Sequence, residues 1–547
     1  MISSQKRQAD ERDRISQLPD NILHLILSSL QTRDAVRTRV LSKSWDQTWN
    51  SFCISDFDLS LTKSWHEVGE ARHSMTSASE KSPLNFVHAQ LAKQSNHGHR
   101  MQRLGLSMCP KLHNPKDSLL HNCIQLALQC GVKELDLNFQ CSRLRCHGYV
   151  VFLYNILSAT TLTSLSLSGC MLSMPRLPGE AISWPSLKVL SLTKIRLHEQ
   201  NISNLISSSP LLEKFVLVHV AGLRNIQLIG FTKLREVKVI DTLRYIVKTE
   251  INAPSLETFW CGFGTRNCQL HVTPAHNIKV LELRNCSVSS EACQELISRC
   301  LALKVLIVHN YNWKKIEVSS SKLEVLQLYA NGIEEVILDA PCLKSFQYTA
   351  QTIPPNFSMC KTSVETAALN LFPNYLSAYR FGRMQEFIGH FNQIKLLKLQ
   401  FVCGFINFSS VGLKGEPPPS LLGIKHLELE IYSSLDTGDQ KKEHRNYEAL
   451  LDGLFWICHP ESLMLTCGLG SNHEFLKVLC KELMDKVERQ HSCPYIHQNC
   501  WGCKLKDVRI ILSGWNEHGK DLTCRTLLDL LPTLGSQKKK ISFSFKW

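Results

Sequence analysis

The sequence predicts an α/β protein built mainly from repeats, with a short helical segment before them and a mixed α/β segment after them. Three observations lead to this prediction. Residues 14–52 carry apolar side chains at helical spacing. Between residues 100 and 435, apolar side chains recur at the first, fourth and sixth positions of a repeating unit. From residue 447 onward this recurrence stops, and segments with helical and strand spacing alternate.

The N-terminal segment is predicted to form three short helices. Pro19 suits the first position of a helix, because the N–H at that position has no partner within the helix. Thr32 and Ser42 have side chains that can cap a second and a third helix. A segment this short cannot bury its apolar side chains on its own. We therefore expect it to dock on the rest of the chain or on a partner.

A contiguous part of this segment resembles the F-box of plant-type F-box proteins: LPDNILHLILSSLQTRDAVRTRVLSKSW. In that family the motif binds a Skp adaptor, which links the protein to a cullin scaffold and a ubiquitin-conjugating enzyme. The resemblance implies an adaptor-facing surface formed by Leu18, Pro19, Ile22, Leu23, Ile26, Leu27 and Leu30. It also implies that the box is completed, partly through internal packing, by Val40, Leu41 and Trp45. An ordinary helical cap on the next domain is the alternative interpretation.

The central part of the chain repeats the pattern L-x-x-L-x-L, and its units recur every 20 to 25 residues from Leu162 to Leu343. This spacing is typical of leucine-rich repeats. The fourth and sixth residues of each unit are expected to point into the core from a short strand, and neighbouring strands to form a parallel sheet. The return limb is expected to be helical at Ser290–Cys300, and tighter, extended or single-turn in the shortest units. The gap before the unit at Ile394 is expected to contain one degenerate unit.

Two turns of the repeats also resemble the plant F-box/leucine-rich-repeat family: Asn252-Ala-Pro-Ser-Leu-Glu257 and Asp339-Ala-Pro-Cys-Leu-Lys344. The resemblance implies a non-catalytic substrate receptor of an SCF-type ubiquitin ligase, in which the F-box binds the Skp adaptor and the repeats bind a target protein. Other subunits of such ligases transfer ubiquitin, and the sequence contains no P-loop, G-x-S-x-G, H-E-x-x-H or kinase motif. The expected organisation is a polar tail at 1–13, the F-box at 14–52, a linker and N-terminal cap at 53–99, a curved leucine-rich-repeat solenoid at 100–435, a polar loop at 436–446 and an α/β cap at 447–547.

The C-terminal segment is predicted to cover an open end of the solenoid. Its apolar spacing predicts helices at Glu474–Arg489 and around Leu527–Leu531, and strands at Ser462–Leu465, Lys506–Leu512 and Ile541–Phe545. Many plant F-box proteins carry a further module at this position, but its motif is not clear in this sequence.

The third, fifth and seventh positions of each unit are expected to face outward on the concave side of the solenoid. An apolar patch flanked by Arg and His has the composition of an interface. The candidate target-binding residues are Trp260, Arg284, His309 and Tyr329. The alternative is that a loop or the C-terminal cap covers this face. Two other functions stay open: a repeat scaffold that recruits no ligase, and a small-molecule or inositol-phosphate site, which would need Arg and Lys to converge at one mouth of the solenoid.

The net charge of +14 does not predict nucleic-acid binding, because the basic residues are scattered singly and aromatic residues do not interleave with them. No apolar run approaches the ~18–20 residues that span a bilayer. The first fourteen residues are polar, unlike a secretory signal. We therefore expect an intracellular protein, cytoplasmic or nuclear, that binds no membrane and whose 22 cysteines are reduced.

One cluster has the spacing of metal ligands: Cys493, His497, Cys500 and Cys503. Two cysteines and a histidine near a further cysteine can form a tetrahedral zinc site. A chain with 22 cysteines and 22 histidines also produces such clusters by chance. A plain loop is therefore the preferred interpretation, a redox pair is a further alternative, and we expect no metal and no cofactor.

Overall fold

The computed structural model of the chain contains two compact units, which are described separately. Unit 1 consists of Met1–Leu256 with Gly262–Pro274, and unit 2 consists of Glu257–Cys261 with Ala275–Trp547. The structure describes residues 15, 18–30, 38–51, 56–58, 83–96, 101–108, 118–139, 149–152, 156, 159–173, 184–197, 199–241, 245–263, 268–284, 290–310, 313–360, 364–371, 378–391, 394–403, 423–433, 447–448, 450–455, 458–467, 473–488, 501–513, 521–531 and 539–547.

The segment near the N-terminus is helical, as predicted. It contains helix α2 (Asp20–Ser29), the 3₁₀ turn η1 (Thr38–Val40) and helix α4 (Lys43–Ser51). Ser42 caps α4, because its Oγ accepts a hydrogen bond of 3.3 Å from the backbone N–H of Trp45. The predicted cap of the second helix, Thr32, lies outside the described residues.

The prediction for Pro19 is wrong by one residue. Pro19 is the N-cap of α2 rather than its first helical residue, because its ψ of 148° is extended. Its carbonyl nevertheless accepts a hydrogen bond of 3.1 Å from the N–H of Leu23, which closes the first helical turn. The hydroxyl of Thr48 on α4 donates over 3.3 Å to the carboxylate of Asp20, so a polar contact joins the two helices.

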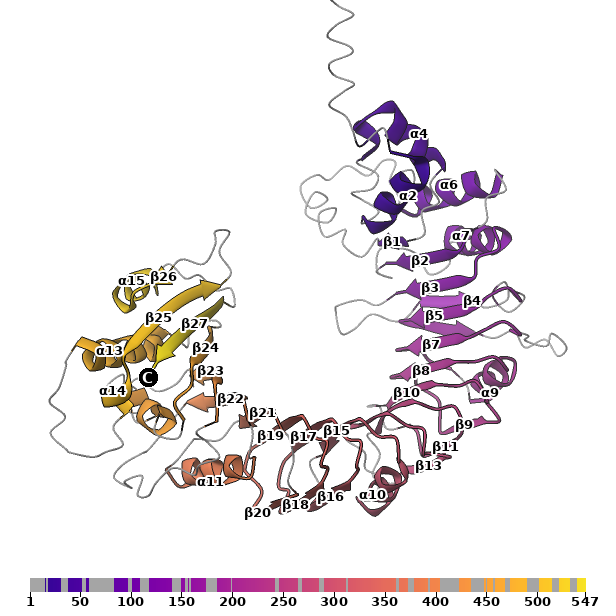
Figure 1. The fold of residues 1–547 in the computed structure, drawn as a ribbon. Coiled ribbons are helices and arrows are strands. Elements are labelled where there is room, and N and C mark those ends of the chain that lie inside the picture. Colours follow the sequence, from indigo (N-terminus) through magenta and orange to yellow (C-terminus); the bar gives the residue numbers. More distant parts are fainter. Residues whose placement is uncertain are drawn as a thin grey trace, which may run out of the picture. The chain divides into compact units, whose positions relative to one another are not determined.

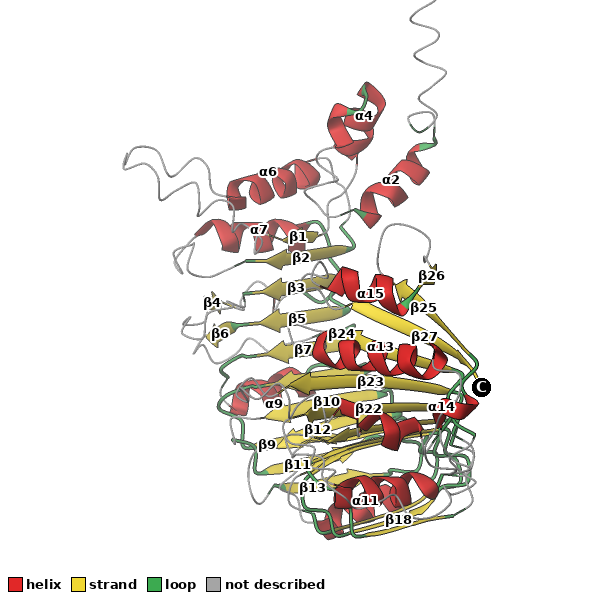
Figure 2. Cartoon of the chain, turned by 90° about the vertical axis from the view of Figure 1, so that its left-hand side faces the viewer, coloured by secondary structure: helices red, strands yellow, loops and turns green. Residues whose placement is uncertain are grey.

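Unit 1 contains a run of parallel strands with the predicted repeat pattern (Figure 1). In β3 and β7 the fourth and sixth residues of each unit are buried and their neighbours are half-buried. Helices α6 (Pro83–Asn96) and α7 (Ser118–Gln129) lie side by side next to the first strands (Figure 2). The run consists of β1 (Asp56–Asp58), β2 (Arg103–Ser107), β3 (Glu134–Asn138), β5 (Ser164–Ser168), β7 (Val189–Thr193), β8 (Lys214–Val218) and β10 (Glu236–Asp241).

In the described part of unit 1, helices α6 and α7 follow β1 and β2, and helix α9 (Glu199–Ser207) follows β7. The return limbs also contain two small sheets. The sheets are parallel and consist of β4 (Tyr149–Phe152) with β6 (Cys170–Ser173), and of β9 (Asn225–Ile229), β11 (Lys248–Asn252) and β13 (Gln269–Thr273).

Unit 2 continues the same pattern, and Figure 1 shows its repeat strands above a second layer of return strands. The repeat strands are β14 (Val280–Arg284), β15 (Val305–Asn310), β17 (Val325–Ala330), β19 (Ser345–Ala350), β21 (Thr366–Leu371), β22 (Leu396–Cys403), β23 (His426–Ser433) and β24 (Ser462–Cys467). The expected degenerate unit is confirmed: β21 pairs with β19 and β22, with Ala367 and Leu369 buried at its fourth and sixth positions. Strand β12 (Thr258–Phe263) contains residues of both units.

The return limbs of unit 2 agree with the predicted forms. Helix α10 (Ser290–Arg299) occupies the segment predicted to be helical. The shortest units return in extended form, through the parallel strands β16 (Lys315–Ser319), β18 (Glu335–Asp339) and β20 (Asn356–Met359). Helix α11 (Ala378–Gly389) returns from β21 to β22.

The C-terminal region is mixed α/β, as predicted. Strand β24 pairs in parallel with β23 on one side and antiparallel with β27 on the other, so the parallel run ends where the antiparallel strands begin. The C-terminal region also contains α13 (His473–Glu488), α14 (Trp501–Lys504), β25 (Asp507–Ser513), β26 (Asp521–Leu522), α15 (Cys524–Leu530) and β27 (Lys539–Lys546). Thr523 caps α15 through a capping box with Thr526.

Candidate functional site

The residues predicted to bind an adaptor divide into a buried and an exposed group. The buried group is Leu23, Leu27 and Trp45, which are at most 3 % exposed and form the interior between α2 and α4. Leu18 and Ile26 are half-buried, and Pro19 is exposed. The exposed apolar side chains are Ile22 (36 %), Leu30 (38 %), Leu41 (62 %) and Val40 (86 %). Only the exposed and half-buried side chains are available to a partner without unfolding the helices.

Sequence reasoning missed Leu25, whose side chain is 64 % exposed on α2. It lies three residues from Ile22, so the two side chains are neighbours on one helix face. The signal was present in the sequence, because Ile22–Leu27 is apolar at every position except His24. A helix that is apolar on two faces buries one face in its own domain and offers the other to a partner.

The structure brings three of the four predicted target-binding residues together in unit 2. Arg284, His309 and Tyr329 occupy the seventh position of successive units and are paired in register on β14, β15 and β17. The rings of His309 and Tyr329 stack with centroids 3.9 Å apart and planes within 2° of each other. The Arg284 Nε donates to Glu282, whose side chain is only 12 % exposed.

The ionisation of these rings follows from their surroundings. Burial lowers the pKa of His309 below its ordinary 6.5, and the positive charge of Arg284 lowers it further against the opposing effect of Glu282. Burial raises the pKa of the Tyr329 hydroxyl above its ordinary 10. At neutral pH both rings are therefore uncharged, and Arg284 is paired with a carboxylate.

Trp260 lies outside this row. It is half-buried on β12 and occupies the fifth position of its unit, whereas the other three residues occupy the seventh. The repeat pattern therefore assigns it to the column that contains Glu282 and Ile307.

A second set of polar side chains, which the sequence analysis did not select, lies beside the row and beyond its end on β19 and β21. The Gln347 Nε2 donates over 3.1 Å to the hydroxyl of Tyr329, which in turn donates over 3.3 Å to the Oε1 of Gln327. On the next strands, the Asn370 Nδ2 donates over 3.1 Å to the hydroxyl of Thr349. A search for charged and aromatic residues passes over these amides, although Gln recurs at the fifth position of two consecutive units.

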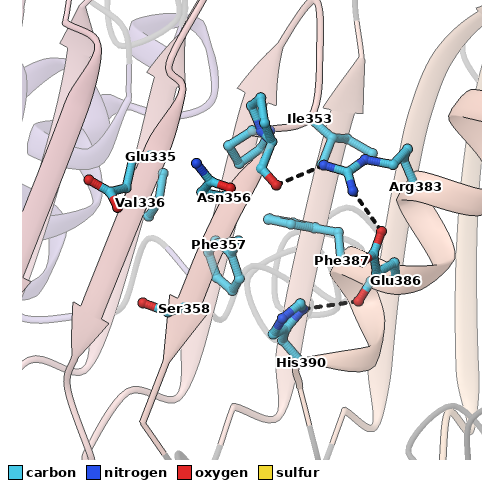
Figure 3. Close-up of a pocket in the computed structure, with 12 residues that line it drawn as sticks. Glu335, Val336, Ile353, Asn356, Phe357, Ser358, Arg383, Glu386, Phe387 and His390 are labelled. Atoms are coloured by element: carbon cyan, nitrogen blue, oxygen red, sulfur yellow. Dashed lines mark hydrogen bonds and ion pairs between the residues drawn. The ribbon is translucent and has the colours of Figure 1, made fainter.

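A surface pocket of about 240 Å³ lies in unit 2 between the return strands and helix α11 (Figure 3). The Arg383 guanidinium donates to the carbonyl of Pro355 and to the carboxylate of Glu386, each over 2.8 Å. Phe357 and Phe387 also line the pocket, with ring centroids 4.5 Å apart. Because the cation is paired within the chain, we assign these residues a structural role, which is to join α11 to β20.

The candidate metal ligands Cys493, His497 and Cys500 lie outside the described residues, as does the side chain of Cys503. Among the residues that are described, no group of three or more His, Cys, Asp or Glu side chains is arranged to hold a metal ion. The described cysteines are free thiols, and burial raises the pKa of Cys170 to about 12. Within the same described ranges, no helix combines the length and the apolar character needed to cross a membrane.

Comparison with known proteins gives two family matches. The F-box domain model matches residues 15–56. A leucine-rich-repeat model, described as At1g61320/AtMIF1, LRR domain, matches residues 91–354. The first match contains the exposed apolar side chains of α2 and η1, and the second contains the stacked rings of His309 and Tyr329.

Several curated proteins of Arabidopsis thaliana are similar to this chain. The F-box/LRR-repeat protein At5g02910 is 29 % identical over 48 % of this chain and 50 % of its own length. The putative F-box/FBD/LRR-repeat protein At5g44960 is 28 % identical over 50 % of this chain and 59 % of its own length. The F-box/LRR-repeat protein 25 is 28 % identical over 42 % of this chain and 76 % of its own length. The chain thus spans about half of the first two relatives.

The fold and the comparisons agree. Helices with an exposed apolar surface occupy the segment matched by the F-box model, and stacked parallel strands occupy the segment matched by the leucine-rich-repeat model. The chain therefore carries an F-box domain followed by a leucine-rich-repeat domain, and it is similar to F-box/LRR-repeat proteins of Arabidopsis thaliana.

Proposed function

We propose that this protein is the substrate receptor of an SCF-type ubiquitin ligase. The observation that carries the proposal is an F-box match followed on the same chain by a leucine-rich-repeat match. The F-box binds a Skp adaptor, which connects the chain to a cullin. The repeats bind a target protein that is to be ubiquitinated. The domain boundaries expected from the sequence, including the linker at 53–99 and the loop at 436–446, belong to this proposal.

The adaptor binds through the exposed apolar side chains of the F-box. Ile22, Leu25, Leu30, Val40 and Leu41 are between 36 % and 86 % exposed, whereas the interior of the helices is already closed by Leu23, Leu27 and Trp45. Burial of such side chains against a partner is favourable by about 25 cal/mol for each Å² of apolar surface removed from water. The interior residues support binding indirectly, because they hold the helices that carry the exposed ones.

The receptor acts by proximity rather than by chemistry of its own. A target held on the repeats and a conjugating enzyme held through the adaptor and cullin share one assembly. Their reaction then becomes effectively intramolecular, which raises the effective concentration of target lysines to about millimolar or above. The row formed by Arg284, His309 and Tyr329 is the first part of the target-binding surface in this proposal.

The proposal is tested by capture of purified Skp adaptor on the immobilised full chain. Wild type is compared with Leu18→Ala/Pro19→Ala and with Val40→Ala/Leu41→Ala. Truncation of a central apolar anchor costs about 2–4 kcal/mol of binding free energy, so both double variants should lose capture. Leu301→Ala is the matched control, because Leu301 is 69 % exposed but lies outside the F-box.

The second candidate function is a repeat scaffold that binds proteins without recruiting a ligase. It predicts that wild type captures no adaptor while the target-binding face remains functional. If wild type and both F-box double variants all capture the adaptor, the proposed docking surface is wrong.

A further inference from the structure

The repeat strands of unit 2 carry a surface without charged residues. We define the neutral patch as the residues at the third, fifth and seventh positions of the four repeat units that contain β15, β17, β19 and β21. These side chains point away from the buried residues of the same strands and are half-exposed. None of them is Asp, Glu, Lys or Arg: they are Val305, Ile307, His309, Val325, Gln327, Tyr329, Ser345, Gln347, Thr349, Thr366, Ala368 and Asn370. The chain as a whole is 20 % charged, so the gap is local.

The return strands of the same repeats have the opposite character. Their outward residues include Lys315, Glu317, Glu335 and Asp339, and Lys315 forms an ion pair of 3.1 Å with Glu335. The two faces of these repeats therefore differ in charge although they share the same units. A surface that only faces water is expected to carry charged residues, as the return strands do. The lack of charged residues in the neutral patch therefore needs another explanation.

The borders of the neutral patch are charged but paired. On β14, Arg284 is bonded to Glu282. On β22 and β23, the Lys398 Nζ lies 2.8 Å from the carboxylate of Glu428. A ligand on the patch therefore meets ion pairs at its ends and no unpaired cation between them.

The hydrogen-bonding groups of the patch match those of a peptide main chain. A primary amide offers both a donor and an acceptor, as a peptide group does. The two hydrogen bonds that join Gln347, Tyr329 and Gln327 use one N–H of Gln347 and the Oε1 of Gln327. They do not use the Oε1 of Gln347 or the Nε2 of Gln327. The same two hydrogen bonds fix the orientation of both amide groups.

Apolar side chains lie next to these amides. Val305 and Val325 occupy the third position of two neighbouring units and are paired in register. At the fifth position, Ile307 is paired with Gln327. The four strands are about 4.8 Å apart, so the patch is about 15 Å long, which is the length of about four or five extended residues. Amides beside a short apolar column are suited to an extended peptide that pairs its main chain and buries alternate side chains.

We propose that the neutral patch binds an uncharged, extended polypeptide segment of the target, with Gln327 and Gln347 pairing with its main chain. The inference rests on the proposed function and names the class of target segment. An acidic or phosphorylated segment would require unpaired Arg or Lys side chains, and a basic segment would require unpaired Asp or Glu. Charge complementarity therefore favours a neutral occupant.

The experiment is a selection of random twelve-residue peptides, displayed on phage, against the full chain bound to Skp adaptor. A parallel set of synthetic phosphopeptides tests the acidic alternative. The expected result is enrichment of peptides with little net charge and with alternating apolar residues. Gln327→Ala/Gln347→Ala should weaken binding of an enriched peptide about tenfold or more, and Gln347→Glu should weaken it as well. Glu317→Ala and Ser358→Ala, on the return strands of the same repeats, are the matched controls and should change affinity less than twofold.

Three outcomes would overturn the inference. The first is enrichment of acidic or phosphorylated peptides whose binding is lost in Arg284→Ala. The second is that no peptide is enriched, and the third is that enriched peptides bind the glutamine variants as tightly as wild type. Adaptor binding is measured on the same samples and depends on the F-box, so loss of peptide binding with adaptor binding intact contradicts this inference alone.

Discussion

Two leucines on helix α2 provide a sharp separation of folding from binding. Leu25 and Leu27 are two residues apart on the same helix, but Leu25 is 64 % exposed and Leu27 is 1 % exposed. Leu27→Ala removes buried methyl groups and leaves a cavity, which costs about 2–4 kcal/mol of local stability. Leu25→Ala removes methyl groups that are mostly in water, so its effect on stability should stay within about 0.5 kcal/mol.

Amide hydrogen exchange of α2 in the full chain measures the first effect. Since about 1.4 kcal/mol is a factor of ten, Leu27→Ala should lower the protection of the α2 amides about 30- to 1,000-fold. Leu25→Ala should leave protection unchanged but weaken Skp adaptor binding about tenfold or more, measured by calorimetric titration. Equal loss of protection in both variants would refute the division into a buried and an exposed face. Unchanged adaptor affinity in Leu25→Ala would remove Leu25 from the docking surface.

Two further predictions concern the repeats. In unit 1 the buried carboxylate of Asp241 accepts hydrogen bonds from the backbone N–H groups of Tyr245 (2.7 Å) and Ile246 (2.9 Å), so Asp241→Ala should lower the stability of unit 1 by about 2–4 kcal/mol in denaturant unfolding. Asp241→Asn keeps an acceptor oxygen and should recover most of this loss; an Ala variant as stable as wild type would contradict the assignment. In unit 2 the pKa of His309 is lowered by burial, so the unfolded chain takes up the proton first and stability should fall as the pH decreases below about 6.5. His309→Asn should reduce this pH dependence of stability, measured by thermal unfolding between pH 5 and 7.5. A variant with the same pH dependence as wild type would contradict the role given to His309.

Much of the repeat architecture follows directly from the positions of the leucines. The fourth and sixth residues of each unit must be buried, and this fixes the strands, their register and even the degenerate unit at β21. The helical return at α10 is predictable because Ser290–Arg299 has both helical spacing and a long interval before the next unit. The extended returns at β16, β18 and β20 follow from intervals too short for a helix.

Which side of a short element faces a partner is not predictable in the same way. The spacing on α2 defines an apolar stripe, but it does not distinguish Leu23 and Leu27, which close the interior, from Ile22 and Leu25, which remain exposed. That distinction depends on where α4 places Trp45, which is a tertiary contact. Similarly, Ser462–Leu465 has the spacing of any strand, and only the pairing of β24 with both β23 and β27 shows that it ends the parallel run.

On the proposed target-binding face, residue type alone predicts only part of the surface. Aromatic and charged residues at outward positions are conspicuous in a sequence, and Arg284, His309 and Tyr329 do share one row. Gln327, Gln347 and Asn370 are ordinary surface residues until the register places them on adjacent strands. There Gln327 and Gln347 are joined through the hydroxyl of Tyr329, and Asn370 is bonded to Thr349. Long-range pairing, rather than residue type, reveals this part of the surface.

In the proposed function, this chain joins a ligase assembly through its F-box. The most direct measurement is size-exclusion chromatography of the purified full chain mixed with equimolar Skp adaptor and cullin, with light scattering to give the mass of each peak. We expect one peak that contains all three proteins, and separation of the chain from that peak in Val40→Ala/Leu41→Ala. Elution of the folded wild-type chain by itself, beside an intact adaptor–cullin peak, would refute the proposed function.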